Sequence, residues 1–383
     1  MTALHPVPSA VLHASVRGAA EVVQNGDGRA PLRMPAALEP LLPSPALAWV
    51  YGQTAGVRLA LRTAATQLQL AATFTRNAGP DRAMLPVSLA ADVDGVTRWT
   101  AEIDEGHKIV GTATGDVSFI AGNASTLDIV LPPTDRQRAV DIWLPHRAQT
   151  VLHTLAASAP VTAEPAESAD GARLRWVHHG SSISHGHEAR FPTTTWPQLA
   201  ARELGWELTD LGFSGNAMLD PWVAQRIAAT PADIISLKVG INIVGSDAFT
   251  QRSFVPALHG FLDTIRQAHP RTPVVMMTAV ACPLHENTPG PTVGDGSGRF
   301  VAAPVRDSLT LTDTRELIAH AVEARNDPAL ALIDGLSLLN LQESDYLHDG
   351  LHPDAAGLAL IARRAVPQLR DCADRLLPKK GLL

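Results

Sequence analysis

From residue 174 onward the chain alternates short apolar segments with amphipathic ones, and this alternation restricts the fold more than any other feature of the sequence. Apolar runs bounded by turn formers predict strands, at residues 174–178, 208–213, 234–239, 274–280 and 329–333. Apolar residues at helical spacing predict helices, at residues 196–204, 220–229, 254–268, 316–325 and 354–377. The run from Ile234 to Val239 is a near-continuous apolar run, as is typical of a strand buried on both faces. The pattern predicts an α/β fold with a parallel sheet between two layers of helices.

The preceding region has a different period. Apolar and polar residues alternate there with period two, which predicts strands with one buried and one exposed face, at 57–61, 68–74, 87–93, 127–131 and 140–144. Turn formers such as Asp94-Gly95 separate these runs. Several short strands without a long helical stretch predict an all-β sandwich domain over residues 1–160. The stretch 159–172 is predicted to be a linker, followed by the α/β domain at 172–383.

Four short polar motifs lie in the predicted α/β domain, and the first three each follow a predicted strand. In chain order they are His179-Gly180-Ser181-Ser182-Ile183-Ser184, Phe213-Ser214-Gly215-Asn216, Gly240-Ile241-Asn242 and Asp349-Gly350-Leu351-His352. Because sites in such sheets lie at the carboxyl ends of the strands, we expect the motifs to lie close together. A nucleophile, oxyanion donors, an acid and a base in this order point to Ser-His-Asp ester hydrolysis.

Ser182 is the candidate nucleophile, and Ser181 competes with it. A serine hydroxyl needs a base to attack near neutral pH. His352 is the best candidate, because Asp349 lies three residues earlier, near enough to orient the imidazole ring and to stabilise the imidazolium.

Two residues are candidates to stabilise an oxyanion. Gly215 has no Cβ, so its backbone N–H can approach a ligand closely, and the side-chain amide of Asn242 offers a second donor. Each candidate also has an ordinary structural interpretation. Gly215 can be a turn glycine, Asn242 a loop asparagine and Ser182 a turn serine. Asp349-Gly350 can form a turn before a helix that Asp354 caps. The ordered combination, and no single residue, favours catalysis.

Over roughly residues 172–377 these motifs resemble the blocks of the SGNH hydrolase superfamily, the GDSL-type esterases and lipases. The resemblance implies a flavodoxin-like parallel sheet, with Ser182 as nucleophile and Asp349 and His352 as acid and base. The residues that it assigns to the oxyanion are Ser182, through its N–H, Gly215 and Asn242.

Two positions depart from the family pattern. Ser181 stands in place of the aspartate of Gly-Asp-Ser, and Ile243 stands in place of the final aspartate of Gly-x-Asn-Asp. Neither change removes a residue with a catalytic role, although the second alters the surroundings of Asn242. In architecture, the upstream β region resembles the jelly-roll modules that precede this domain in some carbohydrate esterases.

These features predict a serine esterase that hydrolyses short-chain, acetyl-like esters of a sugar or small metabolite through an acyl-enzyme, without a cofactor. An acyltransferase with the same serine and a non-catalytic carbohydrate-binding protein are the alternatives. A net charge of −7 without a Lys/Arg stripe argues against a nucleic-acid partner. No apolar stretch reaches the roughly 20 residues of a membrane span, and the first residues lack a signal-peptide pattern. We therefore expect no membrane partner and a cytoplasmic location.

A histidine cluster overlaps the serine motif, at His178, His179, His185 and His187. His185-Gly186-His187 offers two imidazoles, but zinc sites usually need three or four protein ligands, and no acidic residue stands at a characteristic interval. We expect no metal and interpret these histidines as turn or pocket residues, with a metallohydrolase as the alternative.

Two further features need an interpretation. Residues 283–308 are rich in glycine and proline, and because an unstructured stretch of this length is uncommon, we interpret them as a lid or binding loop, with an inert surface loop as the alternative. The two cysteines, Cys282 and Cys372, are interpreted as ordinary thiols, although a single disulfide between them is also compatible with the sequence.

Overall fold

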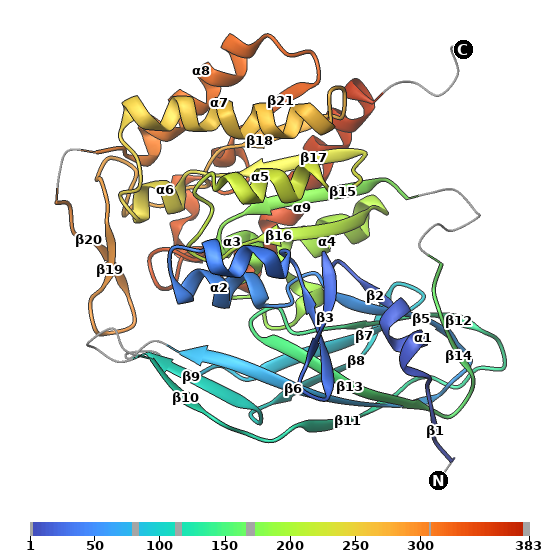
Figure 1. The fold of residues 1–383 in the computed structure, drawn as a ribbon. Helices are drawn as coiled ribbons and strands as arrows, with labels where there is room; N and C mark the ends of the chain where they lie inside the picture. Colours follow the sequence, from blue (N-terminus) through green and yellow to red (C-terminus); the bar gives the residue numbers. More distant parts are fainter. Residues whose placement is uncertain (1–2, 79–83, 112–116, 166–172, 306–307, 378–383) are drawn as a thin grey trace, which may run out of the picture. The chain divides into compact units, whose positions relative to one another are not determined.

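The computed structural model describes residues 3–78, 84–111, 117–165, 173–305 and 308–377. The chain divides into two compact units (Figure 1), which are Met1–Ala172 with Arg190–Thr193, and Arg173–Ala189 with Thr194–Leu383. Each unit has an apolar core of its own.

The first unit contains two sheets. The eight-stranded sheet has the order β10-β9-β6-β13-β4-β3, with β1 beside β13 and β11 beside β6. Its strands are β1 (His5–Pro6), β3 (Glu21–Asn25), β4 (Gly28–Leu32), β6 (Gln67–Ala78), β9 (His107–Gly111), β10 (Val117–Ile120), β11 (Ser125–Val130) and β13 (Gln149–Ala157). The six-stranded sheet has the order β14-β5-β12-β7-β8, with β2 beside β5. Its strands are β2 (Val16–Arg17), β5 (Arg58–Thr63), β7 (Val87–Val93), β8 (Val96–Ile103), β12 (Arg138–Trp143) and β14 (Val161–Ala163), and the helical segments of the unit are α1 (Ser9–Ala14), η1 (Ala36–Leu41) and α2 (Pro45–Gly52).

One apolar core lies between the two sheets of this unit. Leu59 and Leu61 of β5 and Leu68 and Leu70 of β6 are fully buried in it, at the alternating positions that period two requires. The all-β sandwich predicted from the sequence is therefore confirmed. In this unit, strands β6 and β9 pair in the parallel direction.

Strand β7 differs from the prediction of one exposed face, since every one of its residues is buried. The strand lies between β12 and β8, and its buried carboxylate Asp92 is satisfied by hydrogen bonds. Asp92 accepts from the Trp143 indole N–H at 2.9 Å and from the Thr97 hydroxyl at 2.6 Å. A buried carboxylate with such partners can occupy a strand position that would otherwise have to face water.

The predicted linker begins with structure of its own. Strand β14 pairs with β5 in the six-stranded sheet. Glu164 then forms an ion pair with Arg62 at 2.9 Å. The first unit thus continues past residue 160, and residues 166–172 lie outside the described part of the chain.

The second unit is built on a five-stranded sheet with the order β16-β15-β17-β18-β21, in which all neighbouring strands are parallel. Its strands are β15 (Arg175–Gly180), β16 (Glu207–Gly212), β17 (Ile234–Lys238), β18 (Val274–Met277) and β21 (Leu330–Ile333). Its helical segments are α3 (Ser182–His185), α4 (Trp196–Leu204), α5 (Pro221–Ala228), α6 (Ile241–Gly245), α7 (Gln251–Ala268), α8 (Leu311–Arg325), η3 (Gly335–Ser337), η4 (Leu341–Tyr346) and α9 (Ala355–Leu376), while η2 (Pro192–Thr194) spans the division between the units. The alternation read from the sequence predicts this parallel sheet, and the structure confirms it.

Helices cover both faces of this sheet (Figure 1). On one face, α4 and α9 pack over Trp176 and Met277 in a shared apolar cluster. On the other face, the Phe261 ring of α7 stacks on His179 of β15, with ring centroids 6.0 Å apart. This layered arrangement is the one that strand–helix alternation predicts.

The sheet register brings three strand ends to one level. Gly180, the last residue of β15, is paired with Gly212 of β16 and with Lys238 of β17. Because β15 lies between the other two strands, the segments that follow all three leave the sheet side by side. The first three sequence motifs follow these strand ends.

Residues 283–308 contain more structure than the sequence suggests. A short hairpin, β19 (Thr292–Gly294) and β20 (Phe300–Ala302), lies within them. The segment before it is anchored by buried polar contacts: His285 is hydrogen-bonded to Thr292 at 2.7 Å, and Glu286 receives two bonds from Arg315. The expectation of an unstructured loop is wrong for this part. Polar side chains hold it in place, and hydrophobic periodicity in the sequence does not reveal such contacts.

Two other expectations concern the chain as a whole. Cys282 and Cys372 are buried free thiols, and burial raises the pKa of the Cys282 thiol to about 12. Among the described residues, no helix combines the length and the hydropathy that crossing a bilayer requires.

Candidate active site

Ser182 lies at the turn from β15 into the short helix α3. Ser181 is the extended residue before the helix, and its carbonyl oxygen accepts hydrogen bonds from the N–H groups of Ser184 and His185 at 3.0 and 2.9 Å. Ser181 is fully buried, whereas Ser182 is 8% exposed. The Ser182 hydroxyl is hydrogen-bonded to Nε2 of His352 at 2.9 Å. Of the two competing serines, Ser182 is thus the one in contact with the candidate base.

His352 is held by Asp349 on its other side. The Asp349 carboxylate accepts the Nδ1–H of His352 at 2.8 Å through Oδ2, and its Oδ1 accepts the backbone N–H groups of Leu351 and His352 at 2.9 and 2.7 Å. Burial raises the pKa of Asp349, but these hydrogen bonds and the charge of His352 outweigh it and hold the pKa below its usual range. An ionised carboxylate can only accept, so the proton of a neutral His352 stays on Nδ1 and its Nε2 lone pair faces Ser182.

The two oxyanion candidates lie on the segments that follow the strands on either side of β15. Gly215 follows β16, is exposed and has a left-handed φ of 74°, which a glycine adopts without strain. Asn242 lies in α6, after β17, and its side-chain oxygen accepts the Ala217 N–H at 3.0 Å. This bond joins the two segments and leaves the amide N–H groups of Asn242 as its donors.

Comparison with known proteins agrees with this geometry. Residues 179–360 match the model of the GDSL-like lipase/acylhydrolase family. This segment is a GDSL-like domain. A comparison with curated proteins found no match.

Solved structures extend the similarity to both units. The chain is similar to the salicylyl-acyltransferase SsfX3 from a tetracycline biosynthetic pathway, at 26% identity and a TM-score of 0.78 over 95% of this chain and 96% of that one. A putative GDSL-like lipase from Bacteroides ovatus shares the fold of this chain at 20% identity, with a TM-score of 0.66 over 97% of this chain and 98% of that one. A family two carbohydrate esterase from Cellvibrio japonicus shares it at 13% identity, with a TM-score of 0.60 over 98% and 100%. The recognition of the SGNH superfamily from sequence motifs is confirmed.

The four clustered histidines of the serine motif have separate surroundings. His178 is fully buried between the hydroxyls of Ser236 and Ser184, at 2.6 and 2.8 Å, and burial, followed by the charges of His179 and Lys238, holds its pKa well below the usual range. It therefore acts as a neutral core residue. His179 bonds to the Leu211 carbonyl oxygen at 2.8 Å, and His185 accepts the Ser214 N–H at 3.2 Å.

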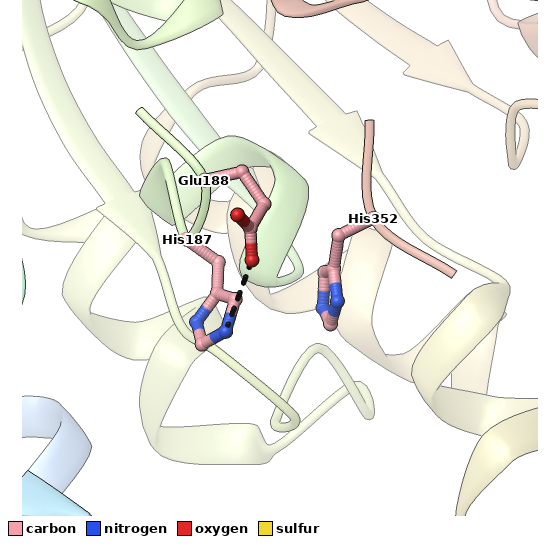
Figure 2. Close-up of side chains that lie close together, drawn as sticks. All are labelled: His187, Glu188 and His352. Carbon is pink, nitrogen blue, oxygen red and sulfur yellow. Dashed lines mark ion pairs between the residues drawn. The ribbon is translucent and has the colours of Figure 1, made fainter. Parts of the chain in front are cut away.

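His187 is the member of this cluster whose ring packs against the candidate base. The rings of His187 and His352 have centroids 4.6 Å apart and planes 33° apart. The acidic Glu188 is the next residue, and its carboxylate lies 3.6 Å from His187 (Figure 2). The same carboxylate also lies 3.6 Å from His348. Sequence reasoning missed Glu188, because adjacent residues do not form a recognisable ligand spacing.

Phe300 is a second neighbour that sequence reasoning did not single out. Its ring packs edge-on against His352 with centroids 5.6 Å apart, and its backbone N–H donates to the Asp349 carbonyl oxygen at 3.1 Å. The hairpin within residues 283–308 thus reaches the residues that hold the candidate base. Phe300 is therefore the residue through which this stretch contacts the candidate site.

Lys238 is a third unpredicted feature. It ends the apolar strand β17 and is buried. Burial, followed by the charge of Arg315, lowers the pKa of its ammonium group to about 8. The sequence alone does not indicate whether a lysine at the end of an apolar strand is buried or exposed.

Proposed function

We propose that this protein is a serine esterase that forms an acyl-enzyme at Ser182. The observation that carries the proposal is the hydrogen-bonded series in which Ser182 contacts Nε2 of His352 at 2.9 Å and Asp349 contacts Nδ1 at 2.8 Å. A hydroxyl paired with a neutral imidazole that a carboxylate orients is the arrangement for nucleophilic attack on a carbonyl.

The proposed reaction has two halves. His352 takes the proton of Ser182 while the hydroxyl oxygen bonds to the ester carbonyl carbon, and Asp349 stabilises the imidazolium that forms. The carbonyl oxygen, now negative, accepts hydrogen bonds from the N–H groups of Ser182 and Gly215 and from the Asn242 amide. The C–O bond to the alcohol then breaks, and the alcohol leaves with the proton from His352. A water molecule repeats the sequence on the acyl-enzyme and releases the acid and free Ser182.

We propose a short acyl group as the substrate's acid part. Phe300 and His187 both pack against His352, so bulky side chains lie next to the point where the ester bond must bind, which supports a small substrate. The alcohol part is proposed to be a sugar or another small metabolite. The similarity to carbohydrate esterases, at 13% identity, supports the fold alone and leaves the sugar as an expectation to test.

Acyl transfer to an alcohol other than water is the second candidate. The observation that favours it is the similarity to a salicylyl-acyltransferase at 26% identity along nearly the whole chain. Hydrolase and transferase share the first half-reaction and differ only in the acceptor that attacks the acyl-enzyme. The choice therefore depends on how the acyl-enzyme partitions between water and an added alcohol.

One set of measurements tests both candidates. A fluorophosphonate should label Ser182, and p-nitrophenyl esters from acetate to decanoate should be cleaved with a preference for the short chains. Graded concentrations of small alcohols and sugars should then be added, and the acid and ester products separated. Free acid as the main product supports the esterase, and new ester as the main product supports the acyltransferase. Absence of labelling and of cleavage would contradict both.

A further inference from the structure

The turn after Ser182 places two potential metal ligands beside the candidate base. Gly186 ends α3 in a left-handed conformation with a φ of 89°, and the N–H groups of Gly186 and His187 donate to the Ser182 carbonyl oxygen at 2.9 and 3.0 Å. These bonds fix the backbone at His187 relative to Ser182. The side chains of His187 and Glu188 are 27% and 24% exposed, so solvent and ions reach them.

Three side chains converge at this point, as Figure 2 shows. His187, Glu188 and His352 each offer one ligand atom, and these atoms all lie within 4.8 Å of one another. Two imidazole nitrogens and one carboxylate oxygen form the ligand set of many zinc sites that keep a fourth position for water. The same set suits magnesium and calcium poorly, because those ions prefer oxygen ligands.

We propose that His187, Glu188 and His352 form an inhibitory binding site for Zn²⁺. Zn–N bonds of about 2.0–2.1 Å in a tetrahedral site place ligand atoms roughly 3.3 Å apart. The three ligand atoms must therefore approach one another by up to about 1.5 Å from their present separations. His187 and Glu188 would supply this movement by rotation about their side-chain bonds, for which their partial exposure leaves room.

The effect on activity follows from the lone pair of His352 and rests on the function proposed above. Nε2 has a single lone pair in the sp² plane, and in the metal-free protein it faces the Ser182 hydroxyl at 2.9 Å. A zinc ion bound to Nε2 takes that lone pair and breaks the contact with Ser182. The hydroxyl then has no base, so turnover stops until the metal is removed.

A neighbouring group of side chains is a weaker site. Glu188, His348 and Asp349 also offer ligand atoms within 4.8 Å of one another. However, both Asp349 oxygens already accept hydrogen bonds, one from the His352 ring and one from two backbone N–H groups. A metal at this second group would have to displace those bonds, so we place the zinc at His187, Glu188 and His352.

The test combines metal binding with turnover. Protein without an affinity tag is freed of metal with a chelator, and Zn²⁺ is then added while heat of binding and p-nitrophenyl acetate cleavage are measured on parallel samples. We expect one Zn²⁺ to bind per chain with a matching loss of activity, and excess chelator to restore the activity. Mg²⁺ and Ca²⁺ at the same concentrations should leave the rate unchanged.

Variants locate the site. His187→Ala and Glu188→Gln should each weaken zinc binding at least about tenfold, since loss of even an outer partner of a metal ligand costs this much. Inhibition is compared with each variant's own metal-free rate. Ser182→Ala lacks the hydroxyl that competes for His352, so it should bind zinc at least as tightly as the unaltered protein. The exposed residue His320 on α8 provides the control, and His320→Ala should bind zinc normally.

Three results would overturn the inference. They are the absence of zinc binding, binding that survives in the double variant of His187 and Glu188, and binding that His348→Ala abolishes while His187→Ala does not. Because the heat of binding is measured without substrate, the zinc titrations test the metal site even if the protein cleaves no ester. Failure of the proposed function and failure of the zinc site are thereby distinguished.

Discussion

The side-chain oxygen of Asn242 accepts the backbone N–H of Ala217 at 3.0 Å. This bond ties α6, after β17, to the segment after β16 that carries Gly215. With the oxygen engaged in this way, only the amide N–H groups of Asn242 remain to bind a developing oxyanion. The position therefore has a structural part and a proposed catalytic part, which different substitutions separate.

Asn242→Ala should lower kcat by roughly 10²–10³-fold with a smaller change in KM, the usual cost of losing one oxyanion donor. Asn242→Asp is the matched control, because the carboxylate still accepts the Ala217 N–H but cannot donate. Steady-state kinetics on p-nitrophenyl acetate measure both variants. If Asn242→Asp keeps the original kcat, the residue only holds the loop and donates nothing to the reaction.

Ser182→Ala should abolish turnover, with a loss on the order of 10⁶-fold as seen for triad serines. Ser181→Ala should keep a substantial part of the activity, because Ser181 is fully buried and its carbonyl, not its hydroxyl, holds the first turn of α3. The measurement is peptide mass spectrometry after fluorophosphonate treatment, together with ester cleavage rates. An adduct on Ser181 would show that the assignment of the nucleophile is wrong.

The pH dependence should have a single acid limb. The pKa of Asp349 lies below its usual range, so the carboxylate stays ionised as the pH falls and its own titration does not enter the profile. Protonation of His352 removes the lone pair that accepts the Ser182 proton, so kcat/KM should fall about tenfold per pH unit on the acid side. The profile should be recorded with a chelator present, at a substrate for which chemistry limits the rate.

Asp349→Asn tests the same pair from the other side. The amide no longer favours the Nδ1–H tautomer, so the acid limb should remain while the rate falls by about 10⁴-fold, as for the equivalent change in a serine protease. A rate near that of the unaltered protein would mean that Asp349 only stabilises the turn of residues 349–352 and takes no part in catalysis.

The strand–helix alternation and the motifs at strand ends are both local properties, and they predicted most of this fold and the candidate site. Period two identified β5, β6, β7, β11 and β12, and apolar runs identified all five strands of the parallel sheet. Ser182, His352 and Asp349 were recognisable because their spacing and neighbours form motifs. The jelly-roll resemblance of the first unit stays a prediction.

What the sequence did not reveal depends on contacts between distant segments. Strand β13 was missed because its register shifts between Leu152 and Thr154, which breaks the alternation. Phe300 reaches His352 only through a hairpin in a glycine- and proline-rich segment, and Glu188 gains its neighbours only when the chain around residue 348 folds beside it. No spacing within one segment encodes such pairs.

Lys238 makes a prediction about stability. Its pKa falls from 10.5 to about 8 on folding, so between these values the unfolded chain holds a proton that the folded chain has lost. Stability should therefore rise with pH across this window. Lys238→Met removes the buried charge and should stabilise the protein at pH 7 by an amount on the order of 3 kcal/mol, at about 1.4 kcal/mol per pKa unit. Urea midpoints of both proteins from pH 7 to 10 check this, and a gap that does not narrow as the pH rises would contradict it.

The hairpin of residues 292–302 should set the acyl preference without taking part in the chemistry. Phe300 packs against His352, and its backbone bond to Asp349 does not depend on its side chain. Phe300→Ala should therefore open space beside the base and move the preference among p-nitrophenyl esters from acetate toward longer chains, chiefly through KM. The rate of labelling by a small fluorophosphonate should change little, since Ser182, His352 and Asp349 keep their contacts. Phe300→Leu fills part of the space and should give an intermediate profile. An unchanged chain-length profile in both variants would mean that the hairpin is inert surface and that other residues form the acyl pocket.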